Sequence, residues 1–297
     1  MASPDTAART DTLRKPRDDE IDFYGLTHIG KVRKTNQDHF LICSLRKQVQ
    51  VHHTSLSTAD QLPLTGERMA FLAAVADGVG GGTKGEVASR LAVQTVTNYA
   101  ALSMKCYHDL DTTDDQAFLD ALQEAAWASH ASVRAEAEGD SDRKGMATTL
   151  TLWLAVWPRA YLLQVGDSRF YTFRDDKLTK ISRDQTMAQE LVDQGVLTTS
   201  TADDSQWAHV LSSSIGGQQT APVVMRVDQH WDDVSLLCSD GLTKHVSDAQ
   251  IAERLRTMTS SKQVCETLLQ DALDDGGSDN VTIIVGRDVR KDHEGEG

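Results

Sequence analysis

Short apolar runs that stop at, or start from, an aspartate recur along this sequence. In MAFLAAVADGVGGG the run Met69 to Ala76 ends at Asp77, YLLQVGDSR ends its run at Asp167, and VSLLCSDG ends at Asp240. In GGSDNVTIIVG the run begins just after Asp279. A short apolar run bounded by turn residues is typical of a strand buried on both faces. The recurrence predicts core strands that carry an aspartate at one end, and these aspartates are candidate functional residues.

The glycines that follow Asp77 are useful at such a strand end. Gly78 and the glycines at 80–82 carry no Cβ, so the backbone can turn sharply and bring main-chain carbonyls within reach of a bound ion or ligand. A single Asp-Gly pair is equally compatible with a plain turn from a strand into a helix. The recurrence of the pattern elsewhere in the chain favours the functional interpretation.

Size and composition limit the architecture and the class of partner. The 297 residues, 39% of them hydrophobic, allow a sizeable core in one large domain or two small ones. A site that used the aspartates from Asp77 to Asp279 would draw on nearly the whole chain, which favours one domain. The formal net charge of −14 argues against a nucleic-acid-binding protein, because a phosphate backbone requires a basic face. The same acidity is compatible with carboxylates that hold divalent cations.

Cysteines and apolar segments bear on the compartment. The four cysteines, at 43, 106, 238 and 265, show neither the close spacing of a zinc site nor the density of a disulfide scaffold, so we expect reduced thiols. The N-terminal stretch has no apolar segment of the secretory kind, and no later stretch approaches about 18 uninterrupted apolar residues. We therefore expect a cytoplasmic protein that does not enter a membrane.

The first half of the chain predicts strands followed by helices. Residues 1–20 are polar and predict a mobile arm. IDFYGLTHIG and DHFLICSL predict two strands joined by KVRKTNQ, with Asp38 opening the second strand. Residues 46–68 predict a polar excursion between strands. GEVASRLAVQTVTNYAAL and QAFLDALQEAAWASHASVRAEAE have the apolar spacing of two helices that cover a sheet.

The second half of the chain repeats this order. ATTLTLWLAVW, AYLLQVGDSRFYTF and KLTKIS predict an antiparallel meander. TMAQELVDQG predicts a helix closed by Gly195, and VLTTSTADDSQWAH is a polar connection suited to a flap. HVLSSSIGG, APVVMRVDQ and DVSLLCSDG predict further strands, followed by helices at SDAQIAERLRTM and SKQVCETLLQDAL and a last strand at NVTIIVGRD. Paired strands with helices outside them indicate an α+β protein.

Six motifs in order give the sequence a family likeness. They are RKTNQD at 33–38, ADGVGG at 76–81, MATTL at 146–150, VGDSR at 165–169, CSDGL at 238–242 and GGSDNVT at 276–282. Each motif alone is weak, but the ordered set resembles the metal-dependent PP2C (PPM) protein phosphatases, and the bacterial branch in particular. The resemblance implies a four-layer α-β-β-α sandwich of two mainly antiparallel sheets flanked by helices. It implies one domain over residues 21–287, with a polar tail over 288–297.

The resemblance also implies a site for two Mn²⁺ or Mg²⁺ ions that share a bridging hydroxide. The positions that match the ligands of the ions are Asp38, Asp77, Gly78 through its carbonyl, Asp240 and Asp279. Asp38 would act at the second ion, and Asp167 matches a position that helps to hold a third ion in bacterial relatives. Arg33 matches the phosphate-binding arginine, whose planar fork suits two phosphate oxygens. Hard cations prefer oxygen ligands, and a pair of them can generate a nucleophile and clamp the phosphoryl group.

The segment 184–210 is the expected place for substrate selection. Its flap residues are Asp184, Thr198, Thr199 and Ser200. The chain departs from the family pattern at Gln37, Val79, Gln185 and Lys244. Val79 stands where animal relatives carry a histidine proposed as the general acid, so the proton for the leaving group would come from a metal-bound water or from another residue. Lys244 stands where an acidic residue is usual.

Two classes of function remain in competition. The leading hypothesis is a monomeric phosphatase that removes phosphate from serine and threonine in proteins and reverses the signalling of Hanks-type kinases. Its substrates would be such a kinase or the targets of the kinase. The alternative is a catalytically weak or inactive regulator that keeps the fold and binds phosphoproteins. The presence of the expected metal aspartates favours the enzyme. A metal-dependent nuclease is disfavoured by the acidic charge.

Overall fold

Two antiparallel sheets form the centre of the molecule, and the chain passes from one to the other several times. The computed structural model describes residues 14–47, 66–80, 83–102, 115–202 and 205–291. In spatial order, the first sheet contains β1 (Ile21–His28), β11 (Val281–Asp288), β10 (Val234–Cys238), β7 (Arg169–Arg174) and β8 (Lys177–Lys180). The second contains β2 (Asp38–Lys47), β3 (Glu67–Val79), β5 (Leu150–Val156), β6 (Arg159–Val165) and β9 (Val223–Asp228), and the short β4 (Ala147–Thr148) pairs with β3.

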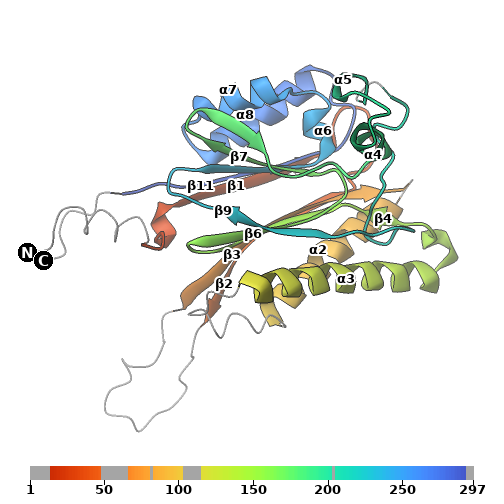
Figure 1. Ribbon diagram of the computed structural model, residues 1–297, viewed down its shortest axis with the longest axis horizontal. Coiled ribbons are helices and arrows are strands. Elements are labelled where there is room, and N and C mark those ends of the chain that lie inside the picture. Colours follow the sequence, from red (N-terminus) through yellow and green to blue (C-terminus); the bar gives the residue numbers. More distant parts are fainter. Residues whose placement is uncertain (1–13, 48–65, 81–82, 103–114, 203–204, 292–297) are drawn as a thin grey trace, which may run out of the picture.

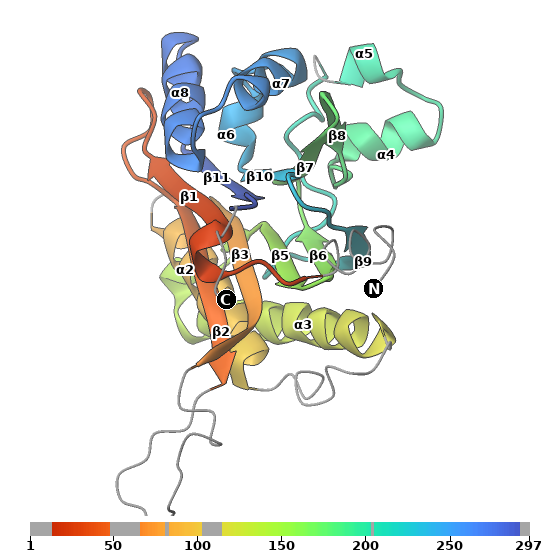
Figure 2. The same cartoon turned by 90° about the vertical axis from the view of Figure 1, so that its left-hand side faces the viewer.

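Helices cover the outer face of each sheet, as Figures 1 and 2 show from two directions. α7 (Asp248–Arg256) and α8 (Ser261–Asp274) lie on the first sheet, and α2 (Lys84–Leu102) and α3 (Asp115–Gly139) lie on the second. The shorter helices are η1 (Asp18–Glu20), η3 (Ser141–Arg143), α4 (Met187–Asp193), α5 (Thr199–Ala202) and α6 (Asp240–Thr243). This arrangement confirms the predicted four-layer sandwich.

Three hydrophobic cores separate these layers. One lies between α2, α3 and the second sheet, one between α7, α8 and the first sheet, and one between the two sheets. Ala74 and Ala76 of β3 belong to the first core, whereas Ala73 and Val75 belong to the core between the sheets. Successive side chains of a strand point to opposite faces, so β3 is buried on both faces, as its unbroken apolar run predicts.

Antiparallel pairing brings the ends and starts of neighbouring strands together. β2 pairs with β3 so that Asp38, at the start of β2, lies opposite Asp77, near the end of β3. β10 pairs with β11, so that Asp240 just after β10 comes near Asp279 just before β11. In an antiparallel pair the end of one strand always adjoins the start of the other. Strand pairing therefore brings together Asp38 and Asp77 in one sheet, and Asp240 and Asp279 beside the other, although the members of each pair are far apart in the sequence.

The predicted meander through VGDSR is wrong in one respect, because β6 and β7 belong to different sheets. Gly166 turns the chain between them with a φ of 102°, and a Cβ at this position would lie 2.6 Å from Cγ2 of Thr149. Only glycine fits this turn. The predicted strand HVLSSSIGG is also wrong: Leu211 and Ile215 form isolated bridges, because the neighbouring serines bond to loops, as when Ser213 Oγ accepts from the Ala221 N–H at 2.9 Å.

Residues 14–20, part of the predicted mobile arm, instead pack against the domain. The guanidinium of Arg14 donates two hydrogen bonds of 2.7 Å to the carboxylate of Glu20, which is buried. The carbonyl of Glu20 accepts from the N–H of Val289 at 2.7 Å, and Asp288, assigned to the tail, is the last residue of β11. The described residues on both sides of the predicted 21–287 therefore pack as part of the domain. The rest of the arm at 1–13, most of the 46–68 excursion and the tail beyond 291 lie outside the described residues.

We expect Glu20→Gln to lower the free energy of unfolding by about 1.5–3 kcal/mol, because it breaks a buried charge-assisted pair. The hydrogen bonds from Arg14 lower the pKa of Glu20 to about 2, from an ordinary value of 4.5. A carboxyl whose pKa is lowered on folding stabilises the protein above its unfolded pKa. The advantage of wild type over the variant should therefore shrink as the pH falls from about 4.5 to about 2.

Urea denaturation over this pH range measures the difference. Asp19→Asn is the matched control, because Asp19 is exposed and lies 3.5 Å from Lys291. It should change stability by less than about 0.5 kcal/mol. A Glu20→Gln protein as stable as wild type at neutral pH would contradict the assigned role of the pair.

Candidate metal centre and active site

The aspartates at the strand ends line a cleft of about 970 Å³ at one edge of the sandwich. The cleft brings together most of the residues singled out in the sequence: Arg33, Asp77, Gly78, Asp167, Asp240 and Asp279. Asp38 is buried opposite Asp77 in the pairing of β2 with β3. The predicted site residues therefore lie in one region, although they come from both sheets.

Asp77 is held by its own backbone. Its N–H donates to Oγ1 of Thr149 at 2.9 Å, and its carbonyl accepts from the N–H of Thr149 at 2.9 Å and from Oγ1 of Thr148 at 2.8 Å. The carboxyl takes no part in these bonds. Burial, and then repulsion from Asp38 and Asp240, raise the pKa of Asp77 well above its ordinary value. The structure thus fixes this residue in place through its backbone, while its carboxylate lies among other aspartates.

Asp38 is anchored through only one of its two oxygens. Its Oδ2 accepts hydrogen bonds from Oγ of Ser239 at 2.8 Å and from Oγ1 of Thr282 at 2.7 Å. Its Oδ1 is buried and has no hydrogen-bond partner within the described part of the chain. Burial raises the pKa of Asp38 to about 6, although the two hydroxyls act to lower it. An orphaned buried oxygen is costly unless a ligand satisfies it.

Two basic side chains, those of Lys244 and Arg33, pair with the aspartates that follow β10 and precede β11. Nζ of Lys244 lies 2.7 Å from Oδ2 of Asp240 and 2.7 Å from Oδ2 of Asp279. The guanidinium of Arg33 bonds to both oxygens of Asp279, with its Nε 2.7 Å from Oδ1 and its Nη2 2.8 Å from Oδ2. Burial acts to raise the pKa of Asp279, but Arg33 and Lys244 outweigh it and the pKa is lowered. Burial likewise opposes the charged form of Lys244, yet Asp240 and Asp279 raise its pKa.

Asp167 lies at the junction between β6 and β7, beside the same carboxylates. Burial, followed by repulsion from Asp240 and Asp184, raises the pKa of Asp167 to about 8. Asp167 also lines a second, smaller cavity of about 280 Å³ together with Asp240 and Lys244. It therefore connects the main cleft to this side cavity.

Close backbone contact explains the glycine at position 78 and reveals a second one. A Cβ on Gly78 would lie 2.2 Å from the carbonyl oxygen of Gly85, and a Cβ on Gly85 would lie 2.7 Å from the carbonyl oxygen of Gly78. The end of β3 and the start of α2 can approach this closely only if both residues lack side chains. Gly85 was not among the predicted site residues, and its position in the helix-opening GEVAS was the available signal.

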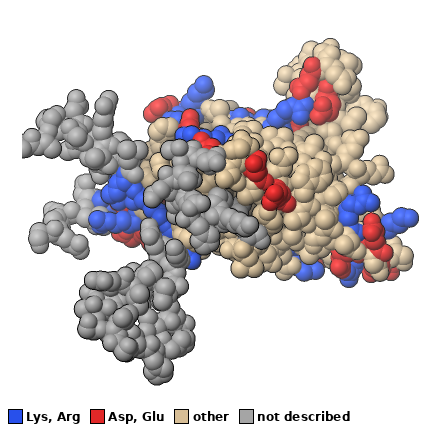
Figure 3. All heavy atoms as spheres, turned by 60° about the horizontal axis from the view of Figure 1, so that its bottom comes forward, with Lys and Arg blue, Asp and Glu red and all other residues tan. Residues whose placement is uncertain are grey.

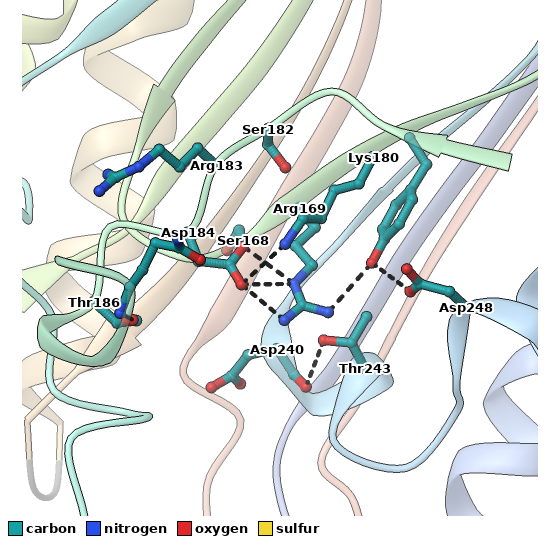
Figure 4. A network of polar contacts seen from close by, with 12 residues as sticks. Ser168, Arg169, Lys180, Ser182, Arg183, Asp184, Thr186, Asp240, Thr243 and Asp248 are labelled. Carbon is teal, nitrogen blue, oxygen red and sulfur yellow. Dashed lines mark hydrogen bonds and ion pairs between the residues drawn. The ribbon is translucent and has the colours of Figure 1, made fainter. Parts of the chain in front are cut away.

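The flap residues predicted from the sequence are placed differently in the structure. Asp184 forms an ion pair with Arg169, whose Nη2 lies 2.8 Å from its Oδ2, and only 13% of the Asp184 side chain is exposed (Figure 4). It is a largely enclosed anchor at the base of the segment. Thr198 bonds to Ser200 and Thr201, and no residue from 198 to 200 is among the described residues that line the cleft. Sequence periodicity could not separate an anchored aspartate from a loop residue.

Other residues of this region line the cleft instead: His209, Val210, Leu211 and Ser214. The departures from the family pattern also have defined places. Gln37 donates from Nε2 to the carbonyl of Gly80 at 2.9 Å, and Val79 is 41% exposed at the cleft. The side chain of Gln185 is buried, accepting from the Gly166 N–H at 2.8 Å and donating to the Ala221 carbonyl at 3.0 Å. Gln37 and Gln185 therefore stabilise neighbouring backbone segments through side-chain hydrogen bonds.

The donor set fits hard divalent cations by its chemistry. Asp38 Oδ1 and Asp240 Oδ1 are both buried without a hydrogen-bond partner in the described ranges, and burial together with neighbouring aspartates raises the pKa of Asp77 and of Asp167. Carboxylate and carbonyl oxygens are the ligands that Mn²⁺ and Mg²⁺ prefer. No group of three or more acidic, histidine or cysteine side chains among the described residues is gathered to hold one ion as it stands. Lys244 lies between two of the carboxylates instead.

Two observations concern alternative partners. On the face turned toward the viewer in Figure 3, the basic side chains of the described residues form separate groups, several of them beside acidic ones, and no continuous basic track crosses it. That face therefore offers no path for a phosphate backbone. None of the helices in the described residues has the length and apolar character needed to cross a membrane.

We expect Gly85→Ala to destabilise the protein by about 1–3 kcal/mol, because the added methyl group overlaps the carbonyl of Gly78 and must push β3 from α2. Chemical denaturation measures this change. Gly139→Ala is the matched control: it also lies in a helix, and a Cβ there meets no atom within 4 Å. The control should be neutral or slightly stabilising. Equal stability of the two variants would show that the close approach is not rigid.

Known proteins share this sequence pattern and this fold. The family model described as protein phosphatase 2C matches residues 52–276. The serine/threonine protein phosphatase PstP of Mycobacterium tuberculosis is 37% identical over 224 residues, which cover 75% of this chain and 41% of that protein. The chain thus spans less than half the length of this curated relative.

Solved structures agree with the sequence match. The crystal structure of the Mycobacterium tuberculosis phosphatase PstP/Ppp has a TM-score of 0.73 and 30% identity, and the match covers 91% of this chain and 99% of that one. A structure of the PstP catalytic domain in complex with two manganese ions has a TM-score of 0.70 and 31% identity, with the same coverage. With the family model matching most of the chain and these folds superposing on nearly all of it, the chain belongs to the protein phosphatase 2C family, in its bacterial serine/threonine phosphatase branch.

Proposed function

We propose that this protein hydrolyses phosphoserine and phosphothreonine in proteins with the help of two divalent ions held at the aspartate cleft. The observation that carries the proposal is the convergence of buried, under-neutralised carboxylates at one edge of the sandwich, with Asp38 Oδ1 and Asp240 Oδ1 left without partners among the described residues. Such a cluster is unfavourable unless cations enter it. The names of the relatives supply the reaction class, and the manganese complex of one of them supports the choice of ion.

The residues that would hold the ions are Asp38, Asp77, Asp240, Asp279 and the carbonyl of Gly78. When bound, two such ions activate water as a nucleophile and neutralise charge on the phosphoryl oxygens. Asp167 is the proposed additional ligand for a third ion. We propose Mn²⁺ ahead of Mg²⁺, because the related PstP catalytic domain was solved with manganese.

The chain's own side chains would bind and orient the substrate. Arg33 lines the cleft with 53% of its side chain exposed, so its fork can reach a phosphate group while remaining beside Asp279. The hydroxyls of Ser239 and Thr282 hold Oδ2 of Asp38, which leaves Oδ1 for a ligand. Val79 carries no transferable proton, so the leaving oxygen takes its proton from water or from another residue of the cleft.

The partners belong to the same proposal. The substrates would be phosphoproteins, in particular a serine/threonine kinase or the proteins that such a kinase modifies, and the enzyme would act as a monomer. Selection among substrates would fall to the part of the 184–210 segment that lines the cleft, His209 and Val210, and to the adjoining Leu211.

Purified protein should release phosphate from a phosphothreonine peptide when Mn²⁺ is added and stop when EDTA removes the ion. Asp240→Asn should lower the rate roughly 100-fold or more, because a neutral amide binds a divalent cation poorly. Asp274→Asn is the control, since this exposed aspartate lies on α8 and bonds to Gln270. Its rate should match wild type. Turnover that survives both EDTA and Asp240→Asn would refute the proposed reaction.

A phosphoprotein-binding regulator with little activity is the second candidate. The observation in its favour is that Lys244 and Arg33 already neutralise Asp240 and Asp279. The same assay separates the two. A protein that binds the phosphopeptide in fluorescence polarisation, but releases no phosphate at saturating Mn²⁺, would be the regulator.

A further inference from the structure

Lys244 is placed by α6 directly over the aspartates of the cleft. It is the C-cap of this helix, and its N–H donates to the carbonyl of Asp240 at 2.9 Å. Residues four apart on a helix lie on the same face, so the backbone brings the lysine side chain back over the Asp240 carboxylate. Only 21% of the Lys244 side chain is exposed. The ammonium is therefore a positioned group of the site.

The two contacts of the ammonium involve the carboxylates that the proposed function gives to a metal ion. Nζ is 2.7 Å from Oδ2 of Asp240 and 2.7 Å from Oδ2 of Asp279, and these distances are those of charge-assisted hydrogen bonds. The free oxygen of Asp240, Oδ1, has no partner in the described part of the chain. The Lys244 ammonium is therefore a cation of the protein itself that already lies between these two aspartates.

We propose that Lys244 is a tethered cation that competes with the divalent ion for Asp240 and Asp279. This inference rests on the proposed function, because it concerns the affinity of the same site for its ions. In the absence of metal, Lys244 offsets the repulsion between the two carboxylates and keeps them together. An ion that binds either Oδ2 must displace the ammonium from it, so the lysine weakens the apparent affinity for the ion.

The side cavity next to the cleft can accept the displaced ammonium. The side cavity of about 280 Å³ is lined by Lys244 and also by Asp167 and Thr243. Asp167 is buried and lines the same cavity as Lys244, so its carboxylate is a suitable second partner for the lysine. In that position Lys244 would supply positive charge where the resemblance places a third ion. The lysine would thus exchange the Asp240 and Asp279 carboxylates for that of Asp167 as the metal state changes.

The experiment is calorimetric titration of Mn²⁺ into the metal-stripped full chain, which requires no turnover. Lys244→Met removes the charge but keeps an unbranched side chain, and it should bind Mn²⁺ roughly tenfold or more tightly than wild type. Lys244→Arg retains the charge and should stay close to wild type. Lys34→Met is the matched control, because Lys34 lines the same cleft, is exposed and carries the same charge. Its affinity should change by less than about threefold.

Thermal unfolding gives a second readout that a purely steric role would not produce. In EDTA, Lys244→Met should unfold at a lower temperature than wild type, because the two aspartates lose their counter-charge. In excess Mn²⁺ the difference in unfolding temperature between wild type and Lys244→Met should narrow or reverse, since tighter binding stabilises the folded state more. Lys244→Gln carries the same prediction and replaces the methionine variant if that protein does not fold.

The possible outcomes separate this inference from the proposed function. Tighter binding by the neutral variants, with Lys244→Arg near wild type, supports the competition. Equal Mn²⁺ affinity in wild type, Lys244→Met and Lys244→Gln overturns it and leaves the metal-dependent function intact. Failure of every variant and of wild type to bind Mn²⁺ overturns the proposed function itself, and the competition with it.

Discussion

Electrostatic repulsion among buried carboxylates is the constraint on which the rest of this structure depends. Asp38, Asp77 and Asp167 all have raised pKa values, because burial disfavours their charged forms and neighbouring aspartates add to the effect. A fold can tolerate such a cluster only if the surrounding structure holds it in place. Here the register of β2 with β3 and of β10 with β11 holds it, and all four strands contribute side chains to the hydrophobic core between the sheets.

The counter-charges are distributed unevenly around the cluster. Arg33 and Lys244 neutralise the Asp240 and Asp279 side, whereas Asp38 and Asp77 have hydroxyls or backbone groups as neighbours. Hydroxyls orient a carboxylate, but they do not neutralise it. The side with the bases receives counter-charge from the protein itself, so the opposite side would gain more from a bound cation. Under the proposed function, this asymmetry would link the stability of the fold to metal binding at its edge.

Much of this architecture follows from local patterns in the sequence. The strand ending at Asp77 and the helix after it were predictable, because an unbroken apolar run and a helical period are properties of neighbouring residues. The partition of β6 and β7 between two sheets was not, because it depends on Gly166 meeting Thr149 across the fold. The family resemblance predicts that the aspartates share one site, whereas no local pattern in the sequence does.

Long-range ion pairs explain the remaining differences. The sequence predicts that Asp184 belongs to a flap, because it opens a polar segment. In the structure, Arg169 holds it at the base of that segment. Lys244 appeared only as a departure from an acidic position, and its pairing with Asp279, 35 residues away, depends on how α6 meets the start of β11. A charged residue in a polar stretch gives no local signal of its partner. The chemistry of a site can therefore be read from the sequence more completely than its charge balance.

The most direct measurement is anomalous X-ray scattering from crystals of the protein grown with Mn²⁺. We expect manganese peaks in the aspartate cleft, in contact with Asp77, Asp240 and Asp279, and a Lys244 ammonium that has moved away from Asp240 and Asp279. Crystals grown in excess Mn²⁺ that show no manganese in the cleft, with Lys244 still bridging the two aspartates, would contradict this expectation.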